Sequence, residues 1–171
     1  MGYETDKRWS DRFLPEIKSI LGGVLLTEGS FEEDAKRNSD LLVLHMQAVR
    51  IGCRVRRYPY FLKYPNDFTI RTVRKSGNMT ELAKVLSGWG DYFFYGFSDE
   101  KEERLIYWLV GDFKIFRLWH SMELGKCVPG NGPGREKKNS DGSSDFRAYN
   151  KNIVLKSGPF IIAEKCESKS A

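Results

Sequence analysis

Two runs of aromatic and branched residues, at 92–97 and 105–110, constrain the fold of this chain most strongly. Side chains of these types favour β-strands, and segments that are apolar on both faces are typical of strands buried within a sheet. We therefore expect both runs to form buried strands. With 171 residues, of which 40% are hydrophobic, the chain is long enough for one compact domain around such a sheet.

The remaining elements are predicted from the spacing of apolar residues. Helices are expected at 10–21, at 79–87, and from Asp112, which can cap the helix, through 113–119. Strands are expected at 24–26, 41–44, 51–56 and 68–74, and edge strands at 146–149 and 160–162. We expect 41–44 and 51–56 to be adjacent. This order predicts an α/β fold with a single domain, in which a central mixed β-sheet is flanked by helices.

Residues 125–145 contain five glycines and two prolines, which predicts a long flexible loop. Within it, 130–135 lacks the spacing of a phosphate-binding loop, and 141–145 lacks the full ligand series of a calcium loop. We therefore expect flexible or polar turns at both places. The last residues, 166–171, are expected to fray.

The chain has no apolar run long enough to cross a membrane, and its first residues are polar, unlike a signal peptide. A soluble, cytoplasmic protein without membrane contacts is therefore expected. The three cysteines are widely spaced, which predicts reduced and mostly buried thiols. The two histidines, His45 and His120, are expected to be structural.

The positive charge is concentrated in one part of the chain. Residues 50–75 contain eight basic residues and one acid, and therefore carry +7 in a chain whose net charge is +5, which leaves −2 for the remainder. Strand alternation places Arg54 and Arg56 on one face, and it gives Thr69, Arg71 and Val73 a common face on the next strand. Such a patch favours a polyanionic partner, although solvated edge strands are an alternative explanation.

The aromatic and basic run at 58–64 lies within the same segment. Its rings can stack on nucleic-acid bases, and they can equally attach a loop to the core. Both interpretations remain open at this stage.

The order of these elements resembles the PD-(D/E)XK, or restriction-endonuclease-like, superfamily over about residues 10–97. The resemblance implies an acid on the first helix, which Glu16 matches, and an aspartate at the head of a strand, which Asp40 matches after Ser39. The next strand should carry an acid and a lysine, but this chain has Arg54 and Arg56 there. A guanidinium at a ligand position would repel Mg²⁺, so metal binding would require another acid.

Two residues are candidates for that second acid. Glu81, near the start of the helix after the third strand, is similar to the acid that some families of the superfamily have moved onto this helix. Asp67, at the start of the third strand, is the other candidate. For each acid, an ordinary role at a helix start or turn is the alternative.

The leading prediction is a nucleic-acid-binding protein, with DNA or RNA as partner, that is also a Mg²⁺- or Mn²⁺-dependent endonuclease if Asp40 and Glu81 converge. The resemblance then implies Asp40, Glu81 and Arg56 as catalytic residues, and Asp40, Glu81 and Glu16 as metal ligands. The residues expected to bind nucleic acid are Arg54, Arg56, Arg57, Tyr58, Tyr60, Arg71, Arg74 and Lys75. The alternatives are a catalytically inactive binding module and a protein-interaction factor that uses the aromatic run.

Overall fold

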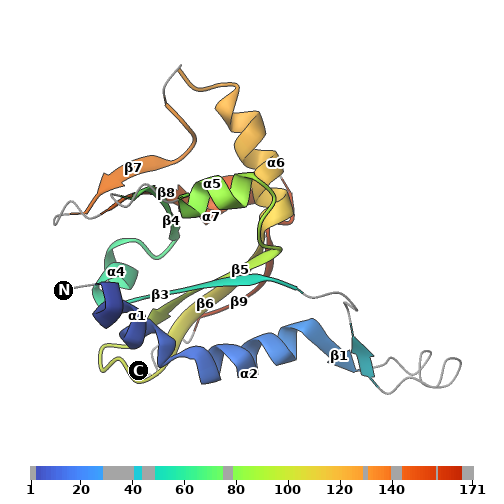
Figure 1. Ribbon diagram of the computed structural model, residues 1–171. Helices are drawn as coiled ribbons and strands as arrows, with labels where there is room; N and C mark the ends of the chain where they lie inside the picture. Colours follow the sequence, from blue (N-terminus) through green and yellow to red (C-terminus); the bar gives the residue numbers. More distant parts are fainter. Residues whose placement is uncertain are drawn as a thin grey trace, which may run out of the picture.

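The computed structural model describes residues 3–28, 41–43, 49–74, 79–128, 131–139, 144–156 and 158–166. Figure 1 shows the elements in these ranges, which form a mixed α/β protein. The helices are α1 (Tyr3–Asp11), α2 (Leu14–Leu25), α4 (Tyr58–Lys63), α5 (Glu81–Leu86), α6 (Phe113–Leu124) and α7 (Lys151–Leu155). The strands are β1 (Leu26–Glu28), β2 (Leu41–Val43), β3 (Ile51–Arg56), β4 (Asp67–Arg74), β5 (Tyr92–Ser98), β6 (Leu105–Asp112), β7 (Arg135–Lys138), β8 (Ser144–Asn150) and β9 (Ile161–Cys166).

The two buried strands predicted from aromatic content are confirmed as β5 and β6. They pair antiparallel in the middle of a four-stranded sheet with the order β3-β5-β6-β9, in which β3 runs parallel to β5. Phe93 and Tyr95 belong to the apolar cluster on one face of this sheet, and Phe94 and Val110 belong to the cluster on the other. Because both faces are apolar, other elements must cover both of them.

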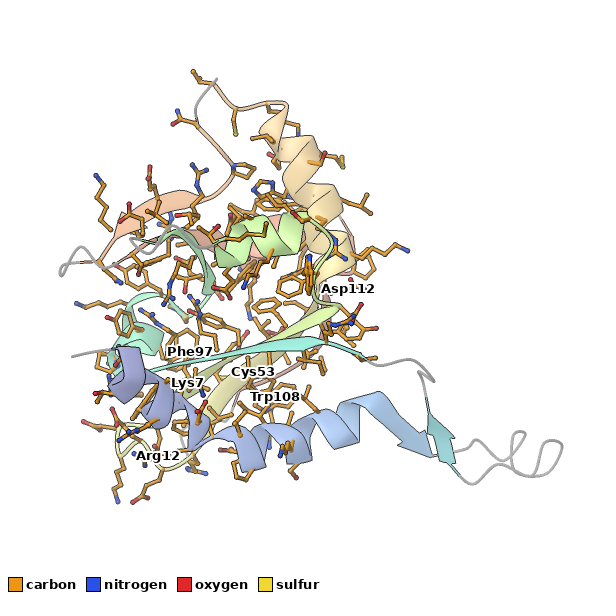
Figure 2. All side chains as sticks on the ribbon, in the orientation of Figure 1. Lys7, Arg12, Cys53, Phe97, Trp108 and Asp112 are labelled. Atoms are coloured by element: carbon orange, nitrogen blue, oxygen red, sulfur yellow. The ribbon has the colours of Figure 1, made fainter. Side chains whose placement is uncertain are left out.

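The first two helices cover one face of the four-stranded sheet, and α2 runs along it in Figure 1. Phe13, between α1 and α2, and Ile17 of α2 are each 2% exposed and pack with Val55 and Phe94. Trp108 joins this cluster, whereas Phe97 faces the opposite side of the sheet, and Figure 2 labels both residues.

The opposite face is covered by a second sheet, with the order β4-β8-β7, and by α6. Phe68 of β4 joins the two sheets, because its ring stacks on Tyr149 of β8 at 5.4 Å and meets Phe93 of β5 at 5.0 Å. Phe116 of α6 meets Phe68 at 5.9 Å and closes the same core. Asp112 caps α6 as predicted, since its carboxylate accepts hydrogen bonds from the first backbone N–H groups of the helix.

The strand pairing differs from the prediction. The described strands form three sheets instead of one central sheet, because β4 pairs with β8 and β2 pairs with β1. The segments at 41–44 and 51–56 were expected to be adjacent, and this pairing is wrong, since β3 pairs with β5. The partner of β4 comes from 144–150, a segment expected at a sheet edge that instead lies in the middle of its sheet.

Several local predictions also need correction. The first helix is divided into α1 and α2, and α2 continues through residues 24 and 25, where a strand was expected. The expected loop at 125–145 contains β7, whose residues pair with β8. Cys53 and Cys166 are exposed instead of buried, because each lies on an edge strand of the four-stranded sheet. The tail beyond Cys166 lies outside the described residues.

In the described part of the chain, no helix combines the length and apolar character that crossing a membrane requires.

Gly111 on β6 is expected to be essential for core packing. A Cβ atom at this position would lie 2.4 Å from Phe93 Cε1 and 2.8 Å from Phe160 Cζ, so Gly111→Ala should destabilise the protein by about 1–3 kcal/mol through overpacking. The control is Gly22→Ala in α2, where nothing lies within 4 Å of the new atom and a gain of about 0.5–1 kcal/mol is expected. Urea unfolding measures both changes, and equal effects would contradict this account of the core.

His120 of α6 should make stability depend on pH. It is 4% exposed, and burial, reinforced by the charge of Arg147, lowers its pKa from an ordinary value of about 6.5. As the pH falls below about 6.5, His120 therefore becomes protonated in the unfolded chain before it does so in the folded protein. The free energy of unfolding decreases from that pH down to the pKa of His120 in the folded protein, by up to about 1.4 kcal/mol per pH unit. His120→Gln should flatten this slope in urea unfolding at several pH values. An unchanged slope would show that another group causes it.

Candidate functional site

A pocket of about 260 Å³ lies between the two larger sheets, with α4 at its side. Buried rings of β5, Tyr95 and Phe97, form part of its lining, together with Phe146 of β8. Its basic lining residues are Arg56, Lys137 and Lys138. The pocket thus combines aromatic surface with positive charge from two strands, β3 and β7.

Strand alternation in β3 brings Arg56 into this pocket. Arg54 and Arg56 lie on the face that carries Tyr95, and Val55 faces α2, so the prediction that the two arginines share a face is confirmed. On β4, Phe68 and Ile70 are buried in the core, as the predicted alternation requires, and the register with β8 shifts between Arg71 and Val73.

The aromatic run at 58–64 forms α4 instead of a loop, and Pro59 is accommodated in the first turn of the helix. Phe61 packs on the core, with its ring 5.4 Å from that of Phe97. Tyr60 and Tyr64, one helical turn apart, line the pocket and are 45% and 40% exposed. One ring is therefore attached to the core, and two remain accessible beside the pocket.

The cations of the pocket rest against its rings. The Arg56 guanidinium carbon lies 4.1 Å from the ring centroid of Tyr60 and 5.9 Å from that of Phe146, and Lys137 Nζ lies 5.8 Å from that of Tyr64. Such cation–π contacts are favourable but leave the positive charge uncompensated. Within the described ranges, no ion pair to a carboxylate is found for Arg56, Lys137 or Lys138.

Arg54 and Glu81 belong to a network beside the pocket. Arg54 donates to the Glu81 carboxylate through Nη2, and through Nη1 to the backbone oxygen and the hydroxyl of Thr69 at 3.1 and 3.2 Å. Glu81 also accepts a hydrogen bond from the backbone N–H of Arg71 at 3.1 Å. The network therefore holds β3, β4 and α5 together.

Tyr95 connects this network to the pocket. Its hydroxyl lies 3.3 Å from the Thr69 hydroxyl. Burial raises the pKa of Tyr95, and the charges of Arg56 and Arg54 partly oppose that rise. Tyr95 therefore stays protonated at neutral pH and acts as a neutral hydrogen-bonding group.

Two of the acids predicted as metal ligands, Glu16 and Glu81, lie on opposite faces of the four-stranded sheet. Glu16 accepts hydrogen bonds from the Leu105 backbone N–H, 3.1 Å from each carboxylate oxygen, on the face covered by α2. Glu81 lies on the other face, against Arg54. Asp40 lies outside the described residues. Among the residues that the structure describes, no group of three His, Cys, Asp or Glu side chains could share a metal ion.

Asp67, the other candidate acid, lines the pocket with a side chain that is 7% exposed. Its carboxylate forms an ion pair with Arg135, and it accepts a hydrogen bond from the Asn150 side chain at 3.4 Å. The one acidic residue of the pocket lining is therefore already compensated, and the net charge of the lining stays positive.

Of the other residues predicted to bind nucleic acid, those that the structure describes do not line the pocket. Arg57 pairs with Glu102 at 2.8 Å and lies 4.4 Å from the Trp9 ring, so it holds α1 against the hairpin loop between β5 and β6. Tyr58 begins α4 without lining the pocket. Arg71 and Arg74 lie on β4, and Lys75 lies outside the described residues.

The sequence analysis missed several pocket residues, among them Lys137, Lys138 and Phe146. The two lysines lie within the segment expected to be a flexible loop, and Phe146 was placed on an edge strand without a functional role. The cluster of Arg135, Lys137 and Lys138 after Gly134 was the available signal.

Comparison of the chain with protein-family models, curated proteins and solved structures finds no match. The resemblance to PD-(D/E)XK nucleases therefore stays a prediction, and the chemistry of the pocket is the basis for a functional proposal.

A double-mutant cycle tests the network of Arg54 and Glu81. Arg54→Met or Glu81→Gln alone should destabilise the protein by about 1–3 kcal/mol, because each leaves a half-buried partner without its ion pair. The double variant should lose less than the sum of the two. Lys126→Met, which removes an exposed ion pair with Glu123, should cost less than about 0.5 kcal/mol. Urea unfolding gives these values, and strictly additive losses would argue against the network.

Proposed function

We propose that this protein binds nucleic acid and that the pocket between its two larger sheets grips the phosphates. The supporting observation is the set of cations at the pocket: Arg56, Lys137 and Lys138 have no ion-pair partner among the described residues. By contrast, Arg54 and Arg57 are neutralised by Glu81 and Glu102.

A phosphate chain matches this arrangement in charge and in geometry. Three cations gathered from β3 and β7 repel one another, and an anion between them would relieve that repulsion. The guanidinium of Arg56 can donate two parallel hydrogen bonds to one phosphate, whereas each lysine acts as a point charge. The alternative of solvated edge strands explains Arg56 less well, because its side chain lies between aromatic rings in the pocket.

This proposal corresponds to a binding module and requires neither Asp40 nor a metal ion. Cleavage with Mg²⁺ or Mn²⁺ stays a separate prediction of the resemblance, with Asp40 and Glu81 as the residues concerned. Glu81 would have to exchange its contact with Arg54 for a metal ion in order to act there.

Salt dependence provides the test. For single-stranded DNA or RNA, three phosphate contacts give a slope of about −2 in log affinity against log salt, which is a loss of roughly 20-fold between about 50 and 200 mM salt. Arg56→Gln should weaken binding and reduce the steepness of that slope by about 0.7. Fluorescence anisotropy with a labelled strand measures both quantities.

The control for this experiment is Arg104→Gln, which removes the same charge from a side chain that is 63% exposed and outside the pocket. Its affinity and slope should match those of the unmodified protein. Two results would contradict this site: an affinity that does not change with salt concentration, or an Arg104→Gln variant that binds as weakly as Arg56→Gln.

A further inference from the structure

We infer that the pocket accepts a single unpaired nucleotide, so that the ligand class is single-stranded nucleic acid and not an uninterrupted duplex. This inference rests on the proposed function and adds to it a role for the rings that surround Arg56. The cations account for phosphate binding, but they do not explain why accessible aromatic rings are placed around them.

The aromatic rings of the pocket differ in how deeply they are buried in the core. Tyr95 and Phe97 are 2% and 1% exposed and are held by core packing. Tyr60 and Tyr64 are 45% and 40% exposed although both lie beside the pocket, so parts of their surfaces remain open to a ligand. Exposed aromatic rings beside cations are the usual platform for stacking unpaired bases, because every base has a flat π surface.

The walls of the pocket come from different elements. Tyr60 belongs to α4 and Phe146 to β8, and the Arg56 guanidinium lies over both rings, 4.1 and 5.9 Å from their centroids. The Arg56 guanidinium thus already covers part of the Tyr60 ring. A nucleobase is also planar and can stack on the ring surface of Tyr60 or Tyr64 that remains exposed, with its phosphate directed to the cations of the pocket.

The shape of the pocket favours an unpaired nucleotide. Its volume, about 260 Å³, lies just below the range of roughly 300–1,000 Å³ that is typical of small-molecule sites. A space of this size has room for one base and not for a base pair, and paired bases are enclosed within the duplex. Proteins that read a duplex insert a convex helix or ribbon into a groove, but here the rings and cations line a concavity.

The experiment compares four ligands by fluorescence anisotropy at one salt concentration: a labelled single strand of about 12 nucleotides, its blunt duplex, an abasic strand of equal length, and a free nucleoside monophosphate as competitor. DNA and RNA strands are both used. The natural strand should bind about tenfold more tightly than the abasic strand, since stacking of one base contributes about that factor. It should also bind more tightly than the duplex and the free nucleotide.

Substitutions at one ring then assign the effect to the pocket. Tyr60→Ala should abolish the preference for the natural strand over the abasic strand, and Tyr60→Phe should keep it. Leu62→Ala is the matched control on α4, because Leu62 is 63% exposed and does not line the pocket. Circular dichroism checks that each variant is folded.

The other outcomes separate this inference from the proposed function. Equal binding of natural and abasic strands, or tighter binding of the duplex, would overturn the inference while Arg56-dependent phosphate binding stands. A free nucleotide that binds as tightly as the strand would also overturn it, and would make the pocket a mononucleotide site. Absence of binding to every ligand would overturn both proposals together.

Discussion

Burial of both faces of the β5–β6 pair is the constraint on which the rest of this structure depends. One face is sealed by side chains from α2 and from the junction before it, such as Phe13 and Ile17. The other face requires a second sheet, which Phe68 and Tyr149 attach through stacked rings, and the N-terminal part of α6. Where the second sheet reaches β3, polar and basic side chains take the place of apolar ones, and the pocket lies at this boundary. The candidate site thus lies where the apolar core between the two sheets gives way to polar and basic side chains.

Local patterns predicted much of the fold, but they did not predict the pairing. The aromatic runs identified β5 and β6, and spacing and capping identified α5 and α6. Pairing depends on contacts between distant segments: β4 joins β8 across more than 60 intervening residues, including a glycine-rich stretch that resembles a loop. Alternation shows which side chains share a face, but it does not show which strand lies beside them. For this reason the prediction of one central sheet was too simple.

The candidate site was only partly predicted, because it too depends on contacts between distant segments. Charge concentration in 50–75 pointed to Arg56 and Tyr60, which do line the pocket. It did not distinguish them from Arg54 and Arg57, because the carboxylates that neutralise these two come from α5 and from the loop between β5 and β6. The availability of a cation is a property of its three-dimensional neighbours. Counting charged residues along the sequence does not separate paired charges from unpaired ones. The count over 50–75 also omitted Lys137 and Lys138, which line the pocket from β7.

Arg56 and Arg57 are adjacent in the chain, yet they serve opposite sides of the four-stranded sheet. Arg56 meets Tyr60 in the pocket, and Arg57 rests on Trp9 beneath α1. Strand alternation sets this division, so a shift of β3 by one residue would exchange the directions of the two guanidinium groups. The pocket would then lose its own arginine and receive one whose acidic partner, Glu102, remains on the far side. The register of an edge strand therefore determines both how the first helix is anchored and which arginine lines the pocket.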